Sequence, residues 1–205
     1  LSHYENVTLA MNTTVEHLVK TAQGIERVDI ASQGDRRSVR VDKGLVLASG
    51  GFNRHPELRA KLLPGVPDEW SPAAPGHTGQ VHELAHQAGA VYGQGGLSHA
   101  FWAPVSLRRR ADGSTASFPH FVMDRGKPGM LTVDQSGQRY LNESSSYHVF
   151  GIRMQAHHAH TPCIPSWLIC DAAALRRYGI GMVRPGGKGL APFLADGYLR
   201  CGQTL

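Results

Sequence analysis

Residues 130–147 constrain the fold more than any other part of the chain, because several local signals follow one another without a gap. The short apolar run Met130–Asp134 is typical of a strand, and a glycine turn follows it. The polar segment Gln138–Glu143 comes next, and the serines at 144–146 can then cap a helix that begins near Tyr147. This order predicts a strand, a sharp polar corner and a helix that opens with an aromatic residue.

Length and composition indicate a globular chain with a hydrophobic core. The chain has 205 residues, which suits one large domain or one domain joined to part of another. Hydrophobic residues make up 41% and charged residues 18%, which is ordinary for soluble domains. No apolar run approaches the roughly 18 residues that a membrane-spanning helix needs. Because the sequence begins at Leu1, we expect it to be a piece of a longer protein.

The net charge of +5 is scattered along the chain and does not indicate nucleic-acid binding. The one basic run, Arg108–Arg110, precedes Ala-Asp-Gly and is expected to form the solvated tip of a hairpin. Nucleic-acid binding would need a broad basic face with interleaved aromatic residues, and the sequence shows none. We therefore expect no nucleic-acid partner.

The sequence contains three cysteines, which are Cys163, Cys170 and Cys201. Their number and spacing suit neither a disulfide scaffold nor a zinc site, so we expect a reducing, cytoplasmic location and buried thiols at Cys163 and Cys170. Among twelve histidines, His157, His158 and His160 gather near one helix end. Because adjacent helix positions point in different directions, we expect an exposed helix terminus there and no metal.

The residues before position 50 are typical of a β-meander. Strands are expected at Val7–Met11, Thr14–Val19, Ile25–Ile30, Ser38–Val41 and Gly44–Ala48. The second of these alternates with period two, and glycine-containing turn sequences separate the middle strands. The last is a continuous apolar run of the kind that a buried strand shows.

The remainder of the chain predicts a mixture of helices and short strands, so the expected fold class is α+β. Helices are expected at His55–Leu63, from Pro75–Gly79 to Gly89, from Tyr147 onward and at Ala172–Tyr178. A second β region is expected at 97–133, and a further strand at Trp167–Asp171. The tail 185–205 is rich in glycine and proline and is expected to be a loop.

The segment Arg139-Tyr140-Leu141-Asn142-Glu143, with Tyr147 shortly after it, resembles the substrate-domain signature of the fumarate reductase/succinate dehydrogenase flavoprotein superfamily. A second segment, Leu45–Phe52, resembles the Ala-Thr/Ser-Gly-Gly-Phe stretch with which these flavoproteins leave the FAD domain beside the cofactor. The resemblance covers roughly Thr8–Arg184. It implies a β-meander remnant of the FAD domain at 1–53, a mixed α+β capping domain of the fumarate reductase flavoprotein type at 54–184, and the tail 185–205.

The resemblance also implies FAD as the cofactor. The implied FAD contacts are Ala48, Ser49, Gly50, Gly51, Thr78 and Gly79. Glycines after a strand let the backbone approach a ligand closely, and a helix start presents N–H groups to it. Here Gln80 replaces the acid that the family usually has, and Val81 replaces its second glycine. The family's N-terminal Gly-x-Gly-x-x-Gly motif is missing, so we expect the isolated chain to lack FAD and to be inactive.

The position that carries a proton-donating arginine in the fumarate reductases carries Tyr147 in this sequence. This resembles the branch that includes the 3-ketosteroid Δ1-dehydrogenases. It implies that Tyr147 takes a proton while the flavin accepts hydride from the neighbouring carbon of a ketosteroid or a similar alicyclic ketone. Because the ordinary pKa of tyrosine is about 10, hydrogen bonds, positive charge or a helix N-terminus must stabilise the phenolate.

Four residues, Phe101, Trp102, His120 and Phe121, are candidates for the wall of an apolar substrate pocket, with plain core packing as the alternative. The polar residues of the corner, Arg139, Asn142 and Glu143, are expected to tie the strand end to the helix start.

Two other functions stay open. A dicarboxylate substrate such as fumarate or succinate would need several cationic groups in the pocket. A non-catalytic binding domain would have a closed fold without a large exposed apolar face. A fragment of a flavoprotein would instead expose the face that the missing FAD domain covers, and a homodimer could form across that face.

Overall fold

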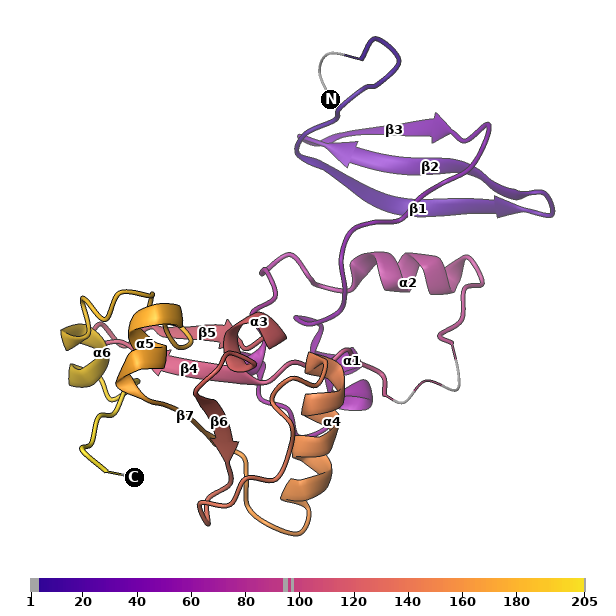
Figure 1. Ribbon diagram of the computed structural model, residues 1–205. Coiled ribbons are helices and arrows are strands. Elements are labelled where there is room, and N and C mark those ends of the chain that lie inside the picture. The colour runs from indigo at the N-terminus through magenta and orange to yellow at the C-terminus, as the bar shows by residue number, and fades with distance from the viewer. Residues whose placement is uncertain (1–3, 94–95, 97, 205) are drawn as a thin grey trace. The chain divides into compact units, whose positions relative to one another are not determined.

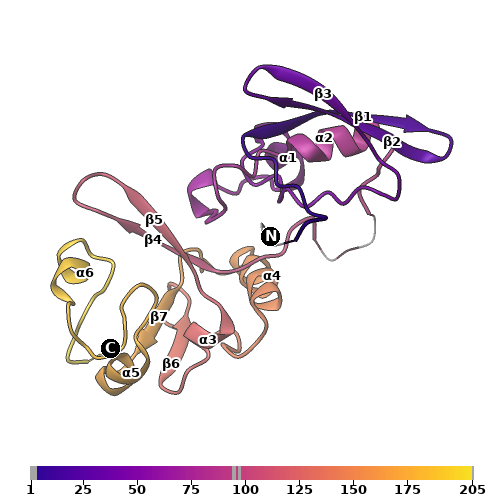
Figure 2. The ribbon, with the colours of Figure 1, turned by 90° about the horizontal axis from the view of Figure 1, so that it is seen from above.

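The contacts of the chain divide it into two units, each with its own strands and helices (Figures 1 and 2). The computed structural model describes residues 4–93, 96 and 98–204. The first unit comprises Leu1–Pro64 and Ala73–Leu97, and the second comprises Gly65–Pro72 and Ser98–Leu205. Short antiparallel sheets and separate helices confirm the predicted α+β class.

A three-stranded antiparallel meander forms the sheet of the first unit. Its order is β1 (Thr13–Thr21), β2 (Gly24–Ser32) and β3 (Asp35–Arg40). Between β2 and β3, Gln33 and Gly34 both have positive φ, 52° and 95°. Two successive positive φ angles suit the tight hairpin turn that matches the twist of its strands. The three middle strands predicted from the sequence are confirmed.

Two helices complete the first unit. α1 (Pro56–Leu62) begins with Pro56, and the His55 imidazole caps it by accepting a hydrogen bond from the Leu58 N–H at 3.4 Å. α2 (Gln80–Gln87) lies against β1 and buries Leu84 (Figure 1). Both helices agree with the predicted ones.

Two of the predicted strands do not form. Val7–Met11 and Gly44–Ala48 lie outside the sheet, and the side chains of Leu9 and Val46 are 62% and 88% exposed. A strand needs a neighbour that satisfies its N–H and C=O groups. Among the described residues, no strand pairs with either segment. An apolar run therefore indicated a preference for burial without identifying a partner.

The second unit is built from two hairpin-like sheets and four helices. β4 (Val105–Arg109) pairs with β5 (Thr115–Pro119), and β6 (Met130–Val133) pairs with β7 (Trp167–Cys170). The helices are α3 (Val122–Arg125), α4 (Tyr147–His158), α5 (Ala172–Tyr178) and α6 (Ala191–Ala195), with a 3-10 turn, η1 (Asp68–Trp70). The buried apolar side chains of the second unit are Val133, Leu141, Phe150, Cys163, Ala174, Leu175 and Val183.

The C-terminal segment packs onto the first hairpin of the second unit and is not simply the predicted loop. Asp196, directly after α6, lies 2.6 Å from Arg108 Nε, and the Arg108 guanidinium lies 4.0 Å from the centroid of the Phe193 ring. Arg108 is therefore half-buried, and only Arg109 and Arg110 have the exposed character predicted for the whole basic run. The sequence could not show this pairing, because Asp196 lies 88 positions away.

The end of α4 is exposed at His158 and His160, as predicted, while His157 is partly buried and, like His158, makes local hydrogen bonds. His157 Nε2 lies 3.0 Å from Asp134 Oδ2, and its ring stacks on that of Tyr140. His158 Nδ1 accepts a hydrogen bond from the Cys163 N–H at 3.0 Å. Within the described residues, no group of His, Cys, Asp and Glu side chains is arranged to hold a metal ion.

The cysteines differ in burial, and the helices bear on the expectation that no segment spans a membrane. Cys163 is fully buried and Cys170 is partly buried, so the prediction of buried thiols is confirmed for Cys163 and holds in part for Cys170, while Cys201 is exposed. Across the described ranges, none of the helices combines the length and apolar character needed to cross a bilayer.

Close packing at Gly151 sets the distance between α4 and the segment before β4. A Cβ atom added at this position would lie 2.6 Å from Trp102 Cβ, which is closer than real contacts allow. Glycine lowers helix stability by about 1 kcal/mol relative to alanine. The glycine at position 151 therefore allows α4 to approach Trp102 closely.

We predict that Gly151→Ala destabilises the second unit by about 1–2 kcal/mol, because the overlap with Trp102 exceeds the gain in helix propensity. Thermal unfolding of the full-length protein would measure the change. Gln155→Ala, at an exposed position of the same helix, should change stability by less than about 0.5 kcal/mol. A higher melting temperature for Gly151→Ala would contradict the prediction.

Candidate active site

Tyr147 is the first residue of α4, where the sequence predicts the helix to begin. Ser146 is the N-cap, and its hydroxyl accepts a hydrogen bond from the Val149 N–H at 3.4 Å. The Tyr147 side chain is partly exposed. Within the described part of the chain, its contacts are with aromatic rings, and no hydrogen bond reaches its hydroxyl. The phenol thus stands at the positive end of a helix dipole with its oxygen open to a ligand.

Two aromatic side chains flank the Tyr147 ring, and both are among the predicted pocket residues. The ring centroids of Phe101 and Phe121 lie 5.3 Å and 5.2 Å from that of Tyr147, in edge-to-face arrangements. Phe101 also stacks on His148, with centroids 4.5 Å apart. Phe101 is 74% exposed and Phe121 is 43% exposed. Large aromatic rings left this exposed beside a phenol form an apolar surface that a ligand could cover.

The structure places the other two predicted pocket residues differently. Trp102 packs its Cβ against Gly151, and its backbone N–H donates to His148 Nδ1 at 3.1 Å. His120 is buried and lies in a polar network, with Nδ1 against Asp124 and Nε2 2.8 Å from Ser106 Oγ. Trp102 therefore packs against α4, and among the described residues no hydrogen bond or ring contact joins His120 to Tyr147.

A buried carboxylate joins the polar corner to the strand before it. Glu143 Oε1 accepts a hydrogen bond from the Thr132 N–H at 2.7 Å, and Arg139 Nη2 donates to Glu143 Oε2 at 2.6 Å. Asn142 Oδ1 accepts from the Ser144 N–H at 2.9 Å. Burial by itself would raise the pKa of Glu143, but the hydrogen bonds from Arg139 and Thr132 outweigh it and leave that pKa below its usual range. Glu143 therefore ties the corner to β6 and to Arg139, while the Asn142 bond stays within the corner.

Asp134 is a second buried carboxylate, and sequence reasoning missed it. Its Oδ1 accepts hydrogen bonds from the backbone N–H groups of Ser136 and Gln138 and from the Ser136 hydroxyl, while Oδ2 faces His157. The Ser136 hydroxyl and His157 hold the pKa of Asp134 well below its usual range. The carboxylate thus fixes the turn after β6 and ties it to the end of α4. An Asp before a Ser-Gly turn is a signal that could have indicated this role.

Arg125 is a second residue that the sequence did not single out. Its side chain is 1% exposed, yet it lies in a short helical turn between Asp124 and Lys127, where a charged residue would be expected to face solvent. A single arginine between two β regions has no sequence signature that distinguishes a buried guanidinium from a solvated one.

The predicted cofactor residues lie in the first unit, near the start of α2. Gly50 has φ 89°, and a Cβ atom there would lie 2.8 Å from the His77 ring. Gly79 has φ 74° and is the N-cap of α2, which lacks a side-chain cap, and a Cβ atom on Gly79 would lie 2.8 Å from His55. Gly50 therefore lies against the His77 side chain, and the predicted cofactor residues Ala48, Ser49 and Thr78 are exposed.

Residues 1–193 match the family of FAD binding domains. The chain belongs to this family. FAD is the cofactor that the family binds, and the match covers both the glycine-rich segments and the Tyr147 region.

Similar proteins include several dehydrogenases. The 4-oxocyclohex-2-ene-1-carboxylate 5-dehydrogenase of Sinomonas cyclohexanicum is 37% identical over 180 residues, which cover 85% of this chain and 30% of that protein. The 3-oxosteroid 1-dehydrogenase of Mycolicibacterium smegmatis is 28% identical over 82% of this chain and 29% of its own length. The crystal structure of the 3-ketosteroid Δ1-dehydrogenase of Sterolibacterium denitrificans, in complex with 1,4-androstadiene-3,17-dione, matches with a TM-score of 0.66 and 28% identity. That match covers 85% of this chain and 31% of the other, so this chain spans about 30% of the length of these relatives.

We predict that Glu143→Gln lowers stability by about 1–2 kcal/mol near pH 7, because it removes a charge-assisted contact with an Arg139 that is itself largely exposed. A folded-state pKa below the ordinary 4.5 stabilises the fold above pH 4.5, and this contribution is lost as the pH falls further. The deficit of the variant should therefore shrink below pH 4.5. Thermal unfolding of the full-length protein between pH 7 and pH 4 would measure it.

The control for this experiment is Glu26→Gln, which changes an exposed carboxylate of β2. It should stay within about 0.5 kcal/mol of the wild-type protein. A Glu143→Gln deficit that is the same at every pH would show that the charge of Glu143 does not stabilise the corner.

Proposed function

We propose that the chain is part of an FAD-dependent dehydrogenase that moves hydride between the flavin and a carbon next to, or conjugated with, a carbonyl group, with Tyr147 as the proton acceptor. The observation that carries this proposal is the phenol at the start of α4, flanked by Phe101 and Phe121 and without an internal hydrogen bond in the described residues. Membership of the FAD binding domain family supports the cofactor.

The first unit carries residues that suit FAD. Backbone at Gly50 and Gly79 has the positive φ that favours glycine, so both segments can approach a ligand without a side chain between. The uncapped N-terminus of α2 presents N–H groups that favour an anionic group such as a phosphate. Bound FAD would supply the hydride acceptor. We propose that Ala48–Gly51, Thr78 and Gly79 hold it, together with elements outside this chain.

Tyr147 would remove the proton from the carbon adjacent to the one that loses hydride. The positive end of α4 favours the phenolate that does this, and the flanking rings exclude water from the oxygen once a substrate covers them. In the reverse direction the same hydroxyl would return the proton. The assignment is compatible with either direction of the reaction.

The substrate that we propose is a cyclic ketone. The similar proteins act on a 3-oxosteroid and on 4-oxocyclohex-2-ene-1-carboxylate, both of which contain a ring ketone. Exposed phenylalanine rings beside Tyr147 suit an apolar ring system. A dicarboxylate would need cationic groups there. Two arginines of this region, Arg125 and Arg139, are already engaged with backbone carbonyls and with Glu143.

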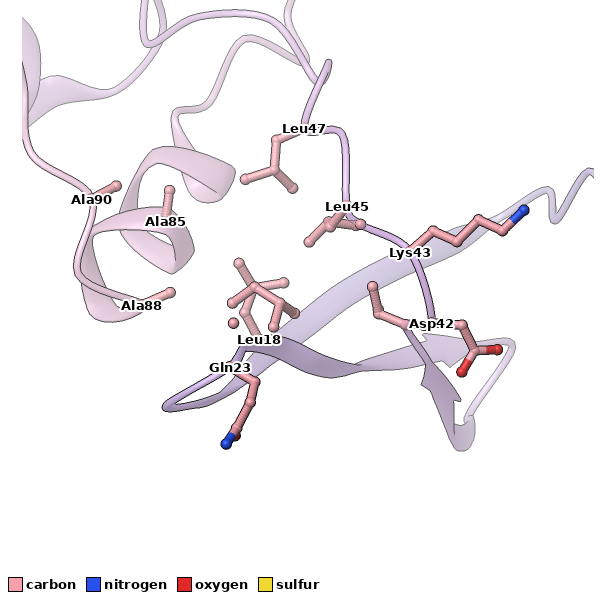
Figure 3. A pocket seen from close by; sticks show the side chains of 13 residues that line it. Leu18, Gln23, Asp42, Lys43, Leu45, Leu47, Ala85, Ala88 and Ala90 are labelled. Carbon is pink, nitrogen blue, oxygen red and sulfur yellow. The ribbon is translucent and has the colours of Figure 1, made fainter.

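An exposed apolar face on the first unit supports the view that the chain is a segment of a longer flavoprotein. A cavity of about 450 Å³ lies between the β1–β2 hairpin, the segment 41–47 and α2. Leu45 and Leu47 face Ala85 and Ala88 across it (Figure 3). We propose that the rest of the FAD-binding domain covers this face, and that the isolated chain would form a homodimer through it. The free cysteines support a reducing, cytoplasmic location for the protein.

We predict that Gly79→Ala lowers the FAD content of the full-length protein. An L-residue at φ 74° is strained, and its Cβ atom would meet the His55 ring, so the start of α2 must move. Gly76→Ala is the matched control, because no atom lies within 4 Å of its Cβ position. Flavin absorbance per protein would measure the effect. Equal FAD content in the two variants would remove α2 from the proposed cofactor site.

We predict that a ring ketone bleaches the flavin absorbance of the full-length protein under anaerobic conditions. A 3-ketosteroid and 4-oxocyclohex-2-ene-1-carboxylate should be compared, with succinate as the dicarboxylate. Bleaching by succinate alone would favour the dicarboxylate function. If the purified full-length protein contained no flavin, the result would favour the non-catalytic binding domain.

Tyr147→Phe should slow this bleaching by at least about 100-fold, because the variant loses the group that accepts the proton. Tyr178→Phe is the control, since it removes a tyrosine hydroxyl in α5 of the same unit. The bleaching rate constants of the two variants and the wild-type protein are compared at saturating ketone by stopped-flow absorbance. Equal rates in the two variants would exclude Tyr147 as the base.

A further inference from the structure

Arg125 is the most deeply buried charged side chain among the described residues, at 1% exposed. Its guanidinium donates hydrogen bonds to three backbone carbonyls. Nε donates to His120 at 3.2 Å, Nη2 donates to Ser145 at 2.6 Å, and Nη1 donates to the Glu143 carbonyl. Burial lowers the pKa of Arg125, but a guanidinium keeps its proton in proteins. The buried positive charge of Arg125 thus holds three backbone carbonyls of the chain in place.

Two of these carbonyls belong to the residues that lead directly into α4. Glu143 and Ser145 precede the N-cap and Tyr147, so the planar guanidinium clamps the end of that loop. The same guanidinium lies 4.2 Å from the centroid of the Phe150 ring, one turn into α4. Arg125 therefore contacts the backbone before Tyr147 and a side chain after it.

The helical turn that carries Arg125 is itself fixed from both ends. Phe121, its N-cap, contacts the Tyr147 ring. Asp124 faces His120 and accepts a hydrogen bond from the Gly181 N–H at 3.0 Å, which ties the turn to the segment after α5. Because α3 is anchored in this way, the guanidinium has a fixed origin from which to place the start of α4.

We propose that Arg125 is a positioning residue for Tyr147, which rests on the proposed function. It sets where the phenol stands relative to the substrate without touching the substrate itself. A hydrophobic residue could fill the same volume at no cost in desolvated charge. The retained charge is explained by the three carbonyls, which only a guanidinium fork can reach together. A displacement of about 1 Å at a reacting group can slow a reaction about 100-fold.

The test uses the full-length protein with FAD bound and the ketone that bleaches the wild-type flavin. Arg125→Lys keeps the charge but loses the fork, and Arg125→Ala leaves a space that added methylguanidinium can enter. Arg110→Ala, at an exposed position of the β4–β5 hairpin, is the control. FAD content, the ketone dissociation constant and the bleaching rate constant are measured for each.

We expect both Arg125 variants to retain FAD and to bind the ketone within about 3-fold of wild type, but to bleach about 10- to 100-fold more slowly. Methylguanidinium should restore part of the rate in Arg125→Ala, and methylammonium should not. Wild-type rates in both variants would overturn the proposal, and so would loss of folding or FAD in both. A wild-type flavin that no ring ketone bleaches would overturn the proposed function instead, and this inference with it.

Discussion

The buried carboxylate of Glu143 is the contact on which the geometry around Tyr147 depends. Its oxygens accept hydrogen bonds from the Thr132 N–H of β6 and from Arg139, and its own carbonyl accepts one from Arg125. One residue thus connects a strand, the corner after it, the turn α3 and the start of α4. Removing such a group would leave buried donors without partners, which costs more than the net value of the bonds. Loss of the Glu143 carboxylate would leave the buried Thr132 N–H without its partner, whereas the largely exposed Arg139 could be hydrated.

Polar and apolar groups around Tyr147 have separate tasks. The charged side chains Glu143, Arg125 and Asp134 direct their hydrogen-bonding capacity to backbone groups of the chain. The aromatic rings of Phe101 and Phe121 remain partly exposed beside the phenol. A ligand at this surface would meet apolar rings and one hydroxyl. This combination is what the proposed ring-ketone substrate would require, whereas a dianion would find no unengaged cation among the side chains named here.

The sequence predicts elements well where their cause is local. The hairpin turn at Gln33–Gly34, the Ser146 cap and the strand before the polar corner all depend on residues within a few positions of one another, and all are found. The apolar run Gly44–Ala48 and the role of Arg125 depend on partners elsewhere. An apolar segment and a single arginine look the same in a sequence whether or not a partner lies nearby in the fold. The strand predicted at Gly44–Ala48 was therefore wrong, and the role of Arg125 was missed.

The two units differ in how well the described residues pair the buried charges and cover the apolar side chains. In the second unit, the buried charges Arg125, Asp134 and Glu143 all have internal partners. In the first, Leu9 and Val46 are largely exposed. Exposed apolar area carries a cost of about 25 cal/mol per Å², so burial of these side chains by a covering polypeptide would stabilise the first unit. Because the proposed FAD contacts lie in the first unit, cofactor binding should depend on the covering polypeptide more than the arrangement around Tyr147 does.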